Sequence, residues 1–213
     1  MRRIITLGIL SMLFCGGVGW IIWATAFRKE PRADLTAATT NARNVGIILF
    51  DFDQGLFCFP SPATAANPAL FATTPPSATA NDLLGQLIRA EYTQSEEIFH
   101  TQNTFLPPKK PDNIILPESR ILEPGECSFS YICGLSSKDD PHTPLLLAPM
   151  IPGTTTFDRK ALKGKAVILC VDQSIRQFPI NSSGHVLVDG KDLFDPAQPF
   201  WHGKKPDLRH PAR

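Results

Sequence analysis

The sequence has almost no excess of charge of either sign. Its 21 Lys and Arg residues face 20 Asp and Glu residues, which gives a net charge of +1 at pH 7. Because the two signs are mixed along the chain, no basic surface for the phosphates of nucleic acid is expected. The chain also lacks a Gly-rich phosphate loop and an ordered Ser–His–Asp set, two common signatures of nucleotide-binding proteins and hydrolases.

Cysteine is scarce, and its spacing does not predict a zinc site. None of the five cysteines forms a C-x-x-C pair or lies beside a His cluster. If residues 127–133 form one strand, Cys127 and Cys133 lie about 20 Å apart at about 3.3 Å per residue, too far for a mutual bridge. Disulfides from these two to Cys58 or Cys170, and four buried free thiols, both remain open.

The longest apolar run covers residues 4–27, behind a short basic N-terminus at 1–3. Without a charge, it is long enough to cross a bilayer core of about 30 Å as a helix. Trp20, Trp23 and Phe27 lie at its C-terminal end, where aromatic rings favour the lipid interface. We therefore predict a single transmembrane signal-anchor at 4–27, with the C-terminal part exported.

Two other interpretations of this run stay open. Ala24-Thr25-Ala26 is a small-x-small site at which signal peptidase could cut, and this would release an exported protein. Cys15 suggests a lipid attachment site, although the preceding Phe14 is large for that signal. The length of the run favours a retained anchor.

Small and apolar residues then recur with helical spacing. They fall in steps of 3, 4, 3, 4 and 3, at Leu35, Ala38, Ala42, Val45, Leu49 and Phe52. This stripe predicts an amphipathic helix and its end within residues 28–60. Asp34 or Thr36 offers capping chemistry at its start, while Gly55 and Pro60 are typical of its end.

The rest of the chain predicts short helices followed by strands. Residues 61–80 are expected to form a loop, and a helix capped by Asn81 or Asp82 should run to about Ala90. A further short helical piece should begin at Ser95. Strand-like segments follow at 127–135, 144–151, 165–172, 174–180 and 185–190, and the last three suggest an antiparallel meander.

These elements predict an α+β protein: a transmembrane helix, an amphipathic helix, short helices and a small C-terminal antiparallel sheet. Residues 61–193 should form its exported domain, and residues 194–213 a Pro-rich, basic surface tail.

The segment "ILFDFD" at 48–53 has the pattern of a phosphatase nucleophile. A hydrophobic strand ending in Asp-x-Asp would let Asp51 attack phosphorus while Asp53 handles a proton beside magnesium. Haloacid dehalogenase-like phosphatases continue with Gly and then Thr or Val, whereas here Gln54 intervenes. We therefore place Asp51 and Asp53 at the solvated end of the helix and keep the phosphatase as a remote alternative.

His185 lies among Asp189, Asp192 and Asp195. A single His without a second nitrogen ligand at suitable spacing favours a structural role. A calcium loop formed by these acids stays possible, although their spacing lacks the EF-hand pattern. The sequence therefore assigns no catalytic, cofactor-binding or metal-binding residue.

The order of elements resembles type IV pilin-like proteins, above all the pseudopilins of type II secretion. The segment "NARNVGIILFDFDQGLFCFP" (41–60) is similar to the end of the family's long helix, and "GKAVILCVD" and "GHVLVDGKDLFDP" are similar to its closing strands. The standard prepilin N-terminal motif with its Glu is missing, since the chain has "RRIITLGILSML" and no acid before Glu30.

The resemblance implies a non-enzymatic, envelope-anchored structural or interaction protein of bacteria. Its expected location is the inner membrane, single-pass, with the C-terminal domain in the periplasm. Expected partners are the membrane and either further copies of itself or secretion and pilus components. The alternatives are an exported binding protein released by signal peptidase and, less favoured, a phosphatase using Asp51 and Asp53.

Overall fold

The computed structural model describes residues 31–107 and 109–213, and side chains within the first helix from residue 34. The predicted anchor at 4–27, the site Ala24-Thr25-Ala26 and Cys15 lie outside these residues. No helix in the described part is long and apolar enough to span a membrane. The described chain combines helices with an antiparallel sheet, which confirms the α+β class.

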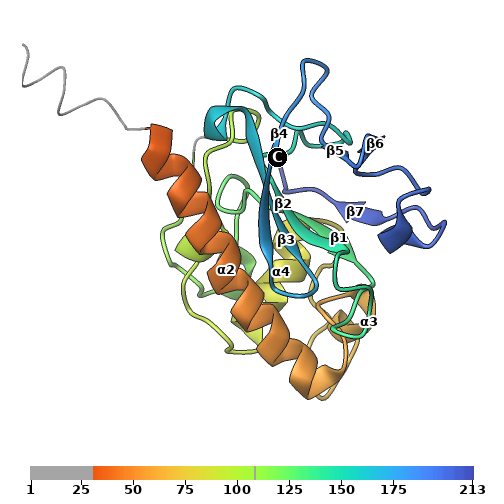
Figure 1. Cartoon of the computed structure of the whole chain (residues 1–213). Coiled ribbons are helices and arrows are strands. Elements are labelled where there is room, and N and C mark those ends of the chain that lie inside the picture. Colours follow the sequence, from red (N-terminus) through yellow and green to blue (C-terminus); the bar gives the residue numbers. More distant parts are fainter. Residues whose placement is uncertain (1–30, 108) are drawn as a thin grey trace, which may run out of the picture.

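Three helices and five main strands form the frame (Figure 1). The helices are α2 (Pro31–Leu56), α3 (Pro62–Ala65) and α4 (Ala80–Arg89). The sheet has the order β4-β3-β2-β1-β7, from β1 (Ser130–Cys133), β2 (Pro144–Ala148), β3 (Lys165–Cys170), β4 (Ile175–Pro179) and β7 (Asp207–Arg209). A separate hairpin pairs β5 (Leu187–Val188) with β6 (Lys191–Asp192). Short 3₁₀ turns are η1 (Glu97–Phe99), η2 (Glu118–Arg120), η3 (Leu162–Gly164) and η4 (Pro199–Trp201).

Helix α2 confirms the predicted stripe. Ala38, Ala42, Val45, Leu49 and Phe52 are all at most 1% exposed. They lie over β3 and β4, beside which α2 runs in Figure 1. Gly46 allows this approach, because a Cβ there would lie 3.1 Å from the Leu169 methyl carbons of β3. The helix is therefore stabilised mainly by burial of its stripe.

The three central strands of the sheet, β1, β2 and β3, are buried on both faces, whereas the edge strands β4 and β7 are partly exposed. Successive residues alternate between two cores: Tyr131, Val167 and Leu169 face α2 and α4, while Ile132 and Ile168 face the other side. The second core is completed by residues from the C-terminal segment, including Val186, Leu193 and Trp201. The period of two along each strand thus places neighbouring residues in different cores.

The C-terminal part differs from two predictions. Segments 165–172 and 174–180 do pair antiparallel, but the third member of the predicted meander leaves the sheet and pairs with β6. Asp189 and Gly190, both with positive φ, form the tight turn that closes this small hairpin.

The residues predicted as a surface tail at 194–213 instead complete the structure. Strand β7 pairs antiparallel with β1, so it covers an edge that would otherwise be open. Trp201 is 5% exposed, and its indole N–H donates to the Leu193 carbonyl at 2.7 Å. The composition of this segment is typical of a surface tail. Its burial could not be predicted from composition, because it depends on residues that are distant in the sequence.

The segment before the sheet also differs in detail. The expected loop at 61–80 contains the short helix α3, and α4 is capped by Thr79 instead of Asn81 or Asp82. Thr79 and Asp82 form a capping box, in which the Asp82 carboxylate accepts the Thr79 N–H at 2.8 Å. Asn81 is buried instead, and its side-chain amide donates to the Leu122 carbonyl at 2.6 Å.

The four described cysteines are free thiols. Cys58 is half-buried, whereas Cys127, Cys133 and Cys170 are buried. Burial raises the pKa of Cys127 to about 12 and that of Cys170 to about 11, so both thiols pack as small apolar groups.

Candidate functional site

The two aspartates of the phosphatase pattern lie on helix α2, not at the end of a strand. Asp51 is exposed, as expected for the solvated helix end. Asp53 is only 4% exposed, which corrects that expectation. Its carboxylate accepts hydrogen bonds from the Ser137 hydroxyl at 2.5 Å and the Ser137 N–H at 3.2 Å. Asp53 thus ties the end of α2 to the turn after β1, and the two carboxylates do not share one site.

His185 forms a pair with a single carboxylate. Its Nδ1 lies 2.6 Å from Asp192 Oδ2, where a hydrogen bond holds the start of the β5–β6 hairpin. The same carboxylate and that of Asp195 also serve turns: Asp192 Oδ1 accepts the Phe194 N–H, and Asp195 Oδ1 accepts the Ala197 N–H, each at 2.8 Å. The predicted structural role of His185 fits this geometry, and these acids do not converge as a calcium loop would require.

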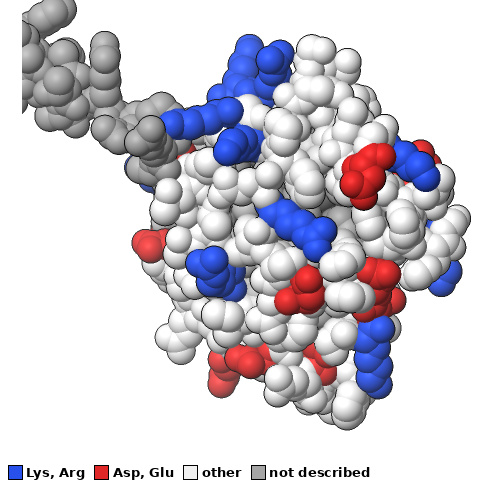
Figure 2. Space-filling view, viewed as in Figure 1, with Lys and Arg blue, Asp and Glu red and all other residues white. Residues whose placement is uncertain are grey.

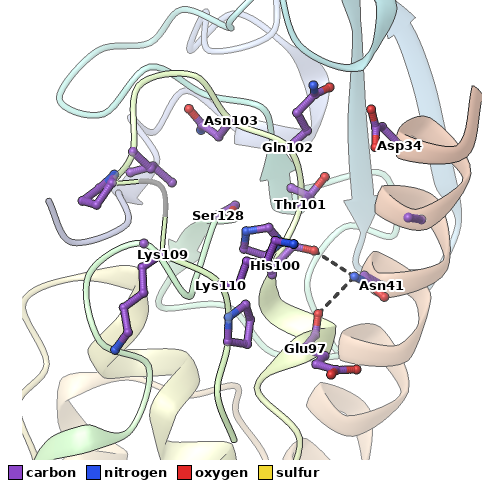
Figure 3. A pocket seen from close by; sticks show the side chains of 15 residues that line it. Asp34, Asn41, Glu97, His100, Thr101, Gln102, Asn103, Lys109, Lys110 and Ser128 are labelled. Atoms are coloured by element: carbon purple, nitrogen blue, oxygen red, sulfur yellow. Dashed lines mark hydrogen bonds between the residues drawn. The ribbon is translucent and has the colours of Figure 1, made fainter. Parts of the chain in front are cut away.

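A cavity of the described structure lies beside the first half of α2. It has a volume of about 580 Å³ and is bounded by α2, η1, the loop at 100–111 and the chain entering β1. Figure 3 shows polar side chains from these separate segments around it. They include the amides of Asn41, Gln102 and Asn103, the hydroxyls of Thr101 and Ser128, and the charged groups of Asp34, Glu97, Lys109 and Lys110. Ala37, Leu106, Pro107 and Pro111 line it as well, so the lining combines an apolar surface with convergent polar groups, as small-molecule sites commonly do.

Hydrogen bonds hold the walls of this cavity in place. The Asn41 side-chain amide donates to the carbonyls of Glu97 at 3.1 Å and His100 at 2.8 Å, which joins α2 to the facing loop (Figure 3). Asn103 donates to the Met150 carbonyl at 3.0 Å on the other side. Thr101 is 5% exposed, and its hydroxyl has no hydrogen-bond partner among the described residues. The walls of the cavity are therefore held by hydrogen bonds, and the Thr101 hydroxyl is a buried polar group that the described residues leave unsatisfied.

A cluster of charged side chains lies behind one wall of the cavity. We call Glu96, Asp112, Glu123 and Glu126, together with Lys109 and Arg120, the acid cluster. Lys109 Nζ lies 3.0 Å from Glu126 Oε1 and also pairs with Glu123. Arg120 Nη2 donates to Asp112 Oδ2 at 2.8 Å. Lys109 also lines the cavity, so the cluster and the pocket share a residue.

The carboxylates of the acid cluster differ in their electrostatics. Burial raises the pKa of Glu96, and the negative charges of Glu126 and Asp112 add to that effect. Glu123 behaves in the opposite way, because its hydrogen bond from Lys109 lowers its pKa. The same contact raises the pKa of Lys109. The outer part of the cluster is thus well paired, whereas its buried part at Glu96 is not.

Sequence reasoning missed this cluster. Its members come from residue 96 and from segments 109–112 and 120–126. No helical or strand-like spacing of apolar residues relates these segments, so the sequence does not predict that they lie close together. The available signal was the placement of acids and bases beside Pro and Gly, in "KKPDN" (109–113) and "EPGE" (123–126), since Pro and Gly favour defined loops and turns.

No protein-family model, curated protein or solved structure matches this chain. Its function is therefore inferred from the geometry and the residues alone.

Proposed function

We propose that this chain is a non-enzymatic, membrane-anchored, pilin-like structural or interaction protein of the bacterial envelope, with type II secretion as its candidate process. The packing of α2 is the observation that supports this role. Shortly after the apolar run at 4–27, α2 buries its stripe on an antiparallel sheet, with a long region of loops and short helices between helix and sheet. A helix placed in this way can hold the folded domain to a membrane segment and still leave its outer side for neighbouring copies.

The outer side of α2 offers a surface for such neighbours. Thr40, Arg43, Ile47 and Asp51 are exposed along one side of the helix, and Ile47 is 50% exposed in spite of its apolar side chain. Figure 2 shows acidic and basic side chains interspersed on the visible face, without a continuous basic patch. Such a surface suits contacts with protein better than contacts with nucleic acid.

Crosslinking in native membranes tests the assembly. An Ile47→Cys variant is made in a chain in which Cys15 and Cys58 are replaced by Ser, and a bis-maleimide reagent is added. Because each chain then carries one accessible thiol, we expect a self-crosslinked dimer or single adducts with secretion components. The matched control is Ser183→Cys in the same background, an exposed position remote from α2 in sequence, which should give far fewer adducts. Monomer alone from Ile47→Cys would contradict the proposal.

A cleaved, exported binding protein is the second candidate, and the framed polar cavity favours it. The intact mass of the protein isolated from its membrane or periplasm separates the two. A chain that begins after Ala26 would support release, whereas a chain that retains residues 4–27 supports the anchor.

Phosphatase activity is not expected on a broad substrate panel with Mg²⁺. Activity that is lost in Asp51→Asn would restore the enzyme alternative.

A further inference from the structure

Three carboxylates converge within the acid cluster. One oxygen each from Glu96, Asp112 and Glu126 lies within 4.8 Å of the other two. This is the spread that a calcium ion requires, since Ca–O distances near 2.4 Å put ligands on opposite sides of the ion about 4.8 Å apart. Among the residues that the structure describes, no other group of His, Cys, Asp or Glu side chains converges in this way.

One of these carboxylates is buried with an unsatisfied oxygen. Glu96 is 0% exposed, and its Oε1 accepts the Leu122 N–H at 2.9 Å. Its Oε2 has no hydrogen-bond partner among the described residues. A buried carboxylate oxygen is costly unless a cation or a donor reaches it. Glu96 Oε2 is therefore positioned to bind a cation or a hydrogen-bond donor that the described residues do not supply.

The charges of the acid cluster do not balance. Its four carboxylates face two cations, Lys109 and Arg120, so the fully ionised cluster carries two excess negative charges. Arg120 pairs with Asp112 and Glu123 at the outer side. Lys109 pairs with Glu123 and Glu126, and its Nζ also lies 4.0 Å from Asp112 Oδ2. Neither cation is paired with Glu96. A single divalent cation would supply the missing charge.

We propose that Glu96, Asp112 and Glu126 form a calcium site that joins the loops at 93–113 to the chain entering β1. Oxygen-only ligands select a hard cation, and the absence of His and Cys from the group disfavours zinc. Calcium suits the irregular arrangement better than magnesium, because Mg²⁺ demands near-octahedral geometry. Backbone carbonyls or water would complete its coordination. Lys109 keeps its pair with Glu123 and competes with the ion for Glu126.

The site would affect the neighbouring cavity. Glu96 directly precedes η1, and Glu126 lies between Gly125 and the buried chain that leads to Ser128. Gly125, Lys109 and Ser128 all line the cavity. An ion held by these carboxylates would therefore brace the cavity wall, whether or not the protein assembles through α2.

Thermal unfolding of the full-length protein in detergent tests the site. The melting temperature is measured in EDTA, in 10 mM CaCl₂ and in 10 mM MgCl₂. For a dissociation constant on the order of 0.1 mM, we expect calcium to raise it by about 5 °C and magnesium to raise it less. No rise with calcium would overturn the proposal.

Variants assign any rise to these carboxylates. In Glu96→Gln, which keeps the size of the side chain but removes a charged ligand, calcium affinity should fall by at least the roughly tenfold loss that follows the removal of an outer-shell partner. Asp112→Asn, at a more accessible position, serves the same purpose if the buried variant does not fold. Glu91→Gln, at an exposed acid outside the cluster, is the matched control and should keep the full shift. If both cluster variants keep it as well, the ion binds elsewhere and the assignment is wrong.

A Lys109→Met variant separates the ion from the ammonium group. If Lys109 competes with calcium for Glu126, its removal should lower the calcium concentration that gives half of the shift. If Lys109 is instead the permanent counter-ion, the variant should be destabilised in EDTA and gain nothing from calcium. The second result would contradict the site.

Discussion

The helix–sheet core and the loop layer at residues 93–128 both contain fully buried side chains, but the two regions are held by different forces. Under α2 the buried side chains are almost all apolar, from Ala38 to Phe52. In the loop layer the buried side chains include the ionisable carboxyl groups of Glu96 and Glu126. The first region should respond to lost volume, and the second to pH and ions. Burial alone therefore does not say what stabilises a part of this molecule.

The largest expected effect lies in the apolar region. Phe52→Ala removes a fully buried ring that packs against Tyr92, and it should lower the free energy of unfolding by about 4 kcal/mol. Urea unfolding of the full-length protein measures the loss. Ile47→Ala on the exposed side of the same helix should stay within about 0.5 kcal/mol. Equal losses would mean that α2 does not bury the side that we describe.

The second effect lies where the two kinds of burial meet. Asp53 is a buried acid at the end of the apolar stripe, and Asp53→Ala leaves the Ser137 hydroxyl and N–H without their acceptor. We expect a loss of about 2 kcal/mol in the free energy of unfolding. Asp51→Ala is the matched control at an exposed position, with a change within about 0.5 kcal/mol. If Asp53→Ala were as mild as the control, the hydrogen bonds to Ser137 would not stabilise the fold.

The smallest effect lies in the charged region and depends on pH. Because the pKa of Glu96 is raised above its ordinary value of 4.5, the folded protein holds a proton that the unfolded chain has already released. Stability that Glu96 contributes at low pH is therefore lost as pH rises from 4.5 through the folded pKa, by at most about 1.4 kcal/mol per pH unit. Glu96→Gln cannot titrate there.

Urea unfolding in EDTA between pH 4 and 8 checks this sign. The free energy of unfolding of the wild type, relative to Glu96→Gln, should fall as pH rises. The acidic groups that face Glu96 are Glu126 and Asp112, and both the wild type and Glu96→Gln retain them. A wild type that gains stability over Glu96→Gln with rising pH would show that Glu96 is already paired, and the two regions would then be less different than proposed.

Much of the fold could be predicted because its signals are local. The stripe of α2 is a spacing of three and four residues, and segments such as 165–172 have the composition of buried strands. The pairing of β7 with β1 could not be predicted, because it joins residues 207–209 to 131–133. The burial of Asp53 was missed for a related reason, since its acceptor role depends on Ser137, which is remote in sequence.

The candidate site was less predictable than the fold. The cavity and the acid cluster are assembled from α2, the loops at 93–126 and the entry to β1, and no repeat in the sequence relates them. Two candidates stood out as sequence patterns. In the structure Asp51 is exposed while Asp53 is buried against Ser137, and His185 pairs with Asp192 alone.

By itself, the sequence determined the amphipathic helix within residues 28–60, the strand segments between 127 and 180 and the apolar run before them, because periodicity and composition act over a few residues. Only the tertiary structure decided which acids are buried, which strand closes the sheet edge and which carboxylates meet. Those outcomes depend on contacts between distant segments. At Glu96 such contacts remove water from the carboxyl group and leave its Oε2 without a hydrogen-bond partner among the described residues.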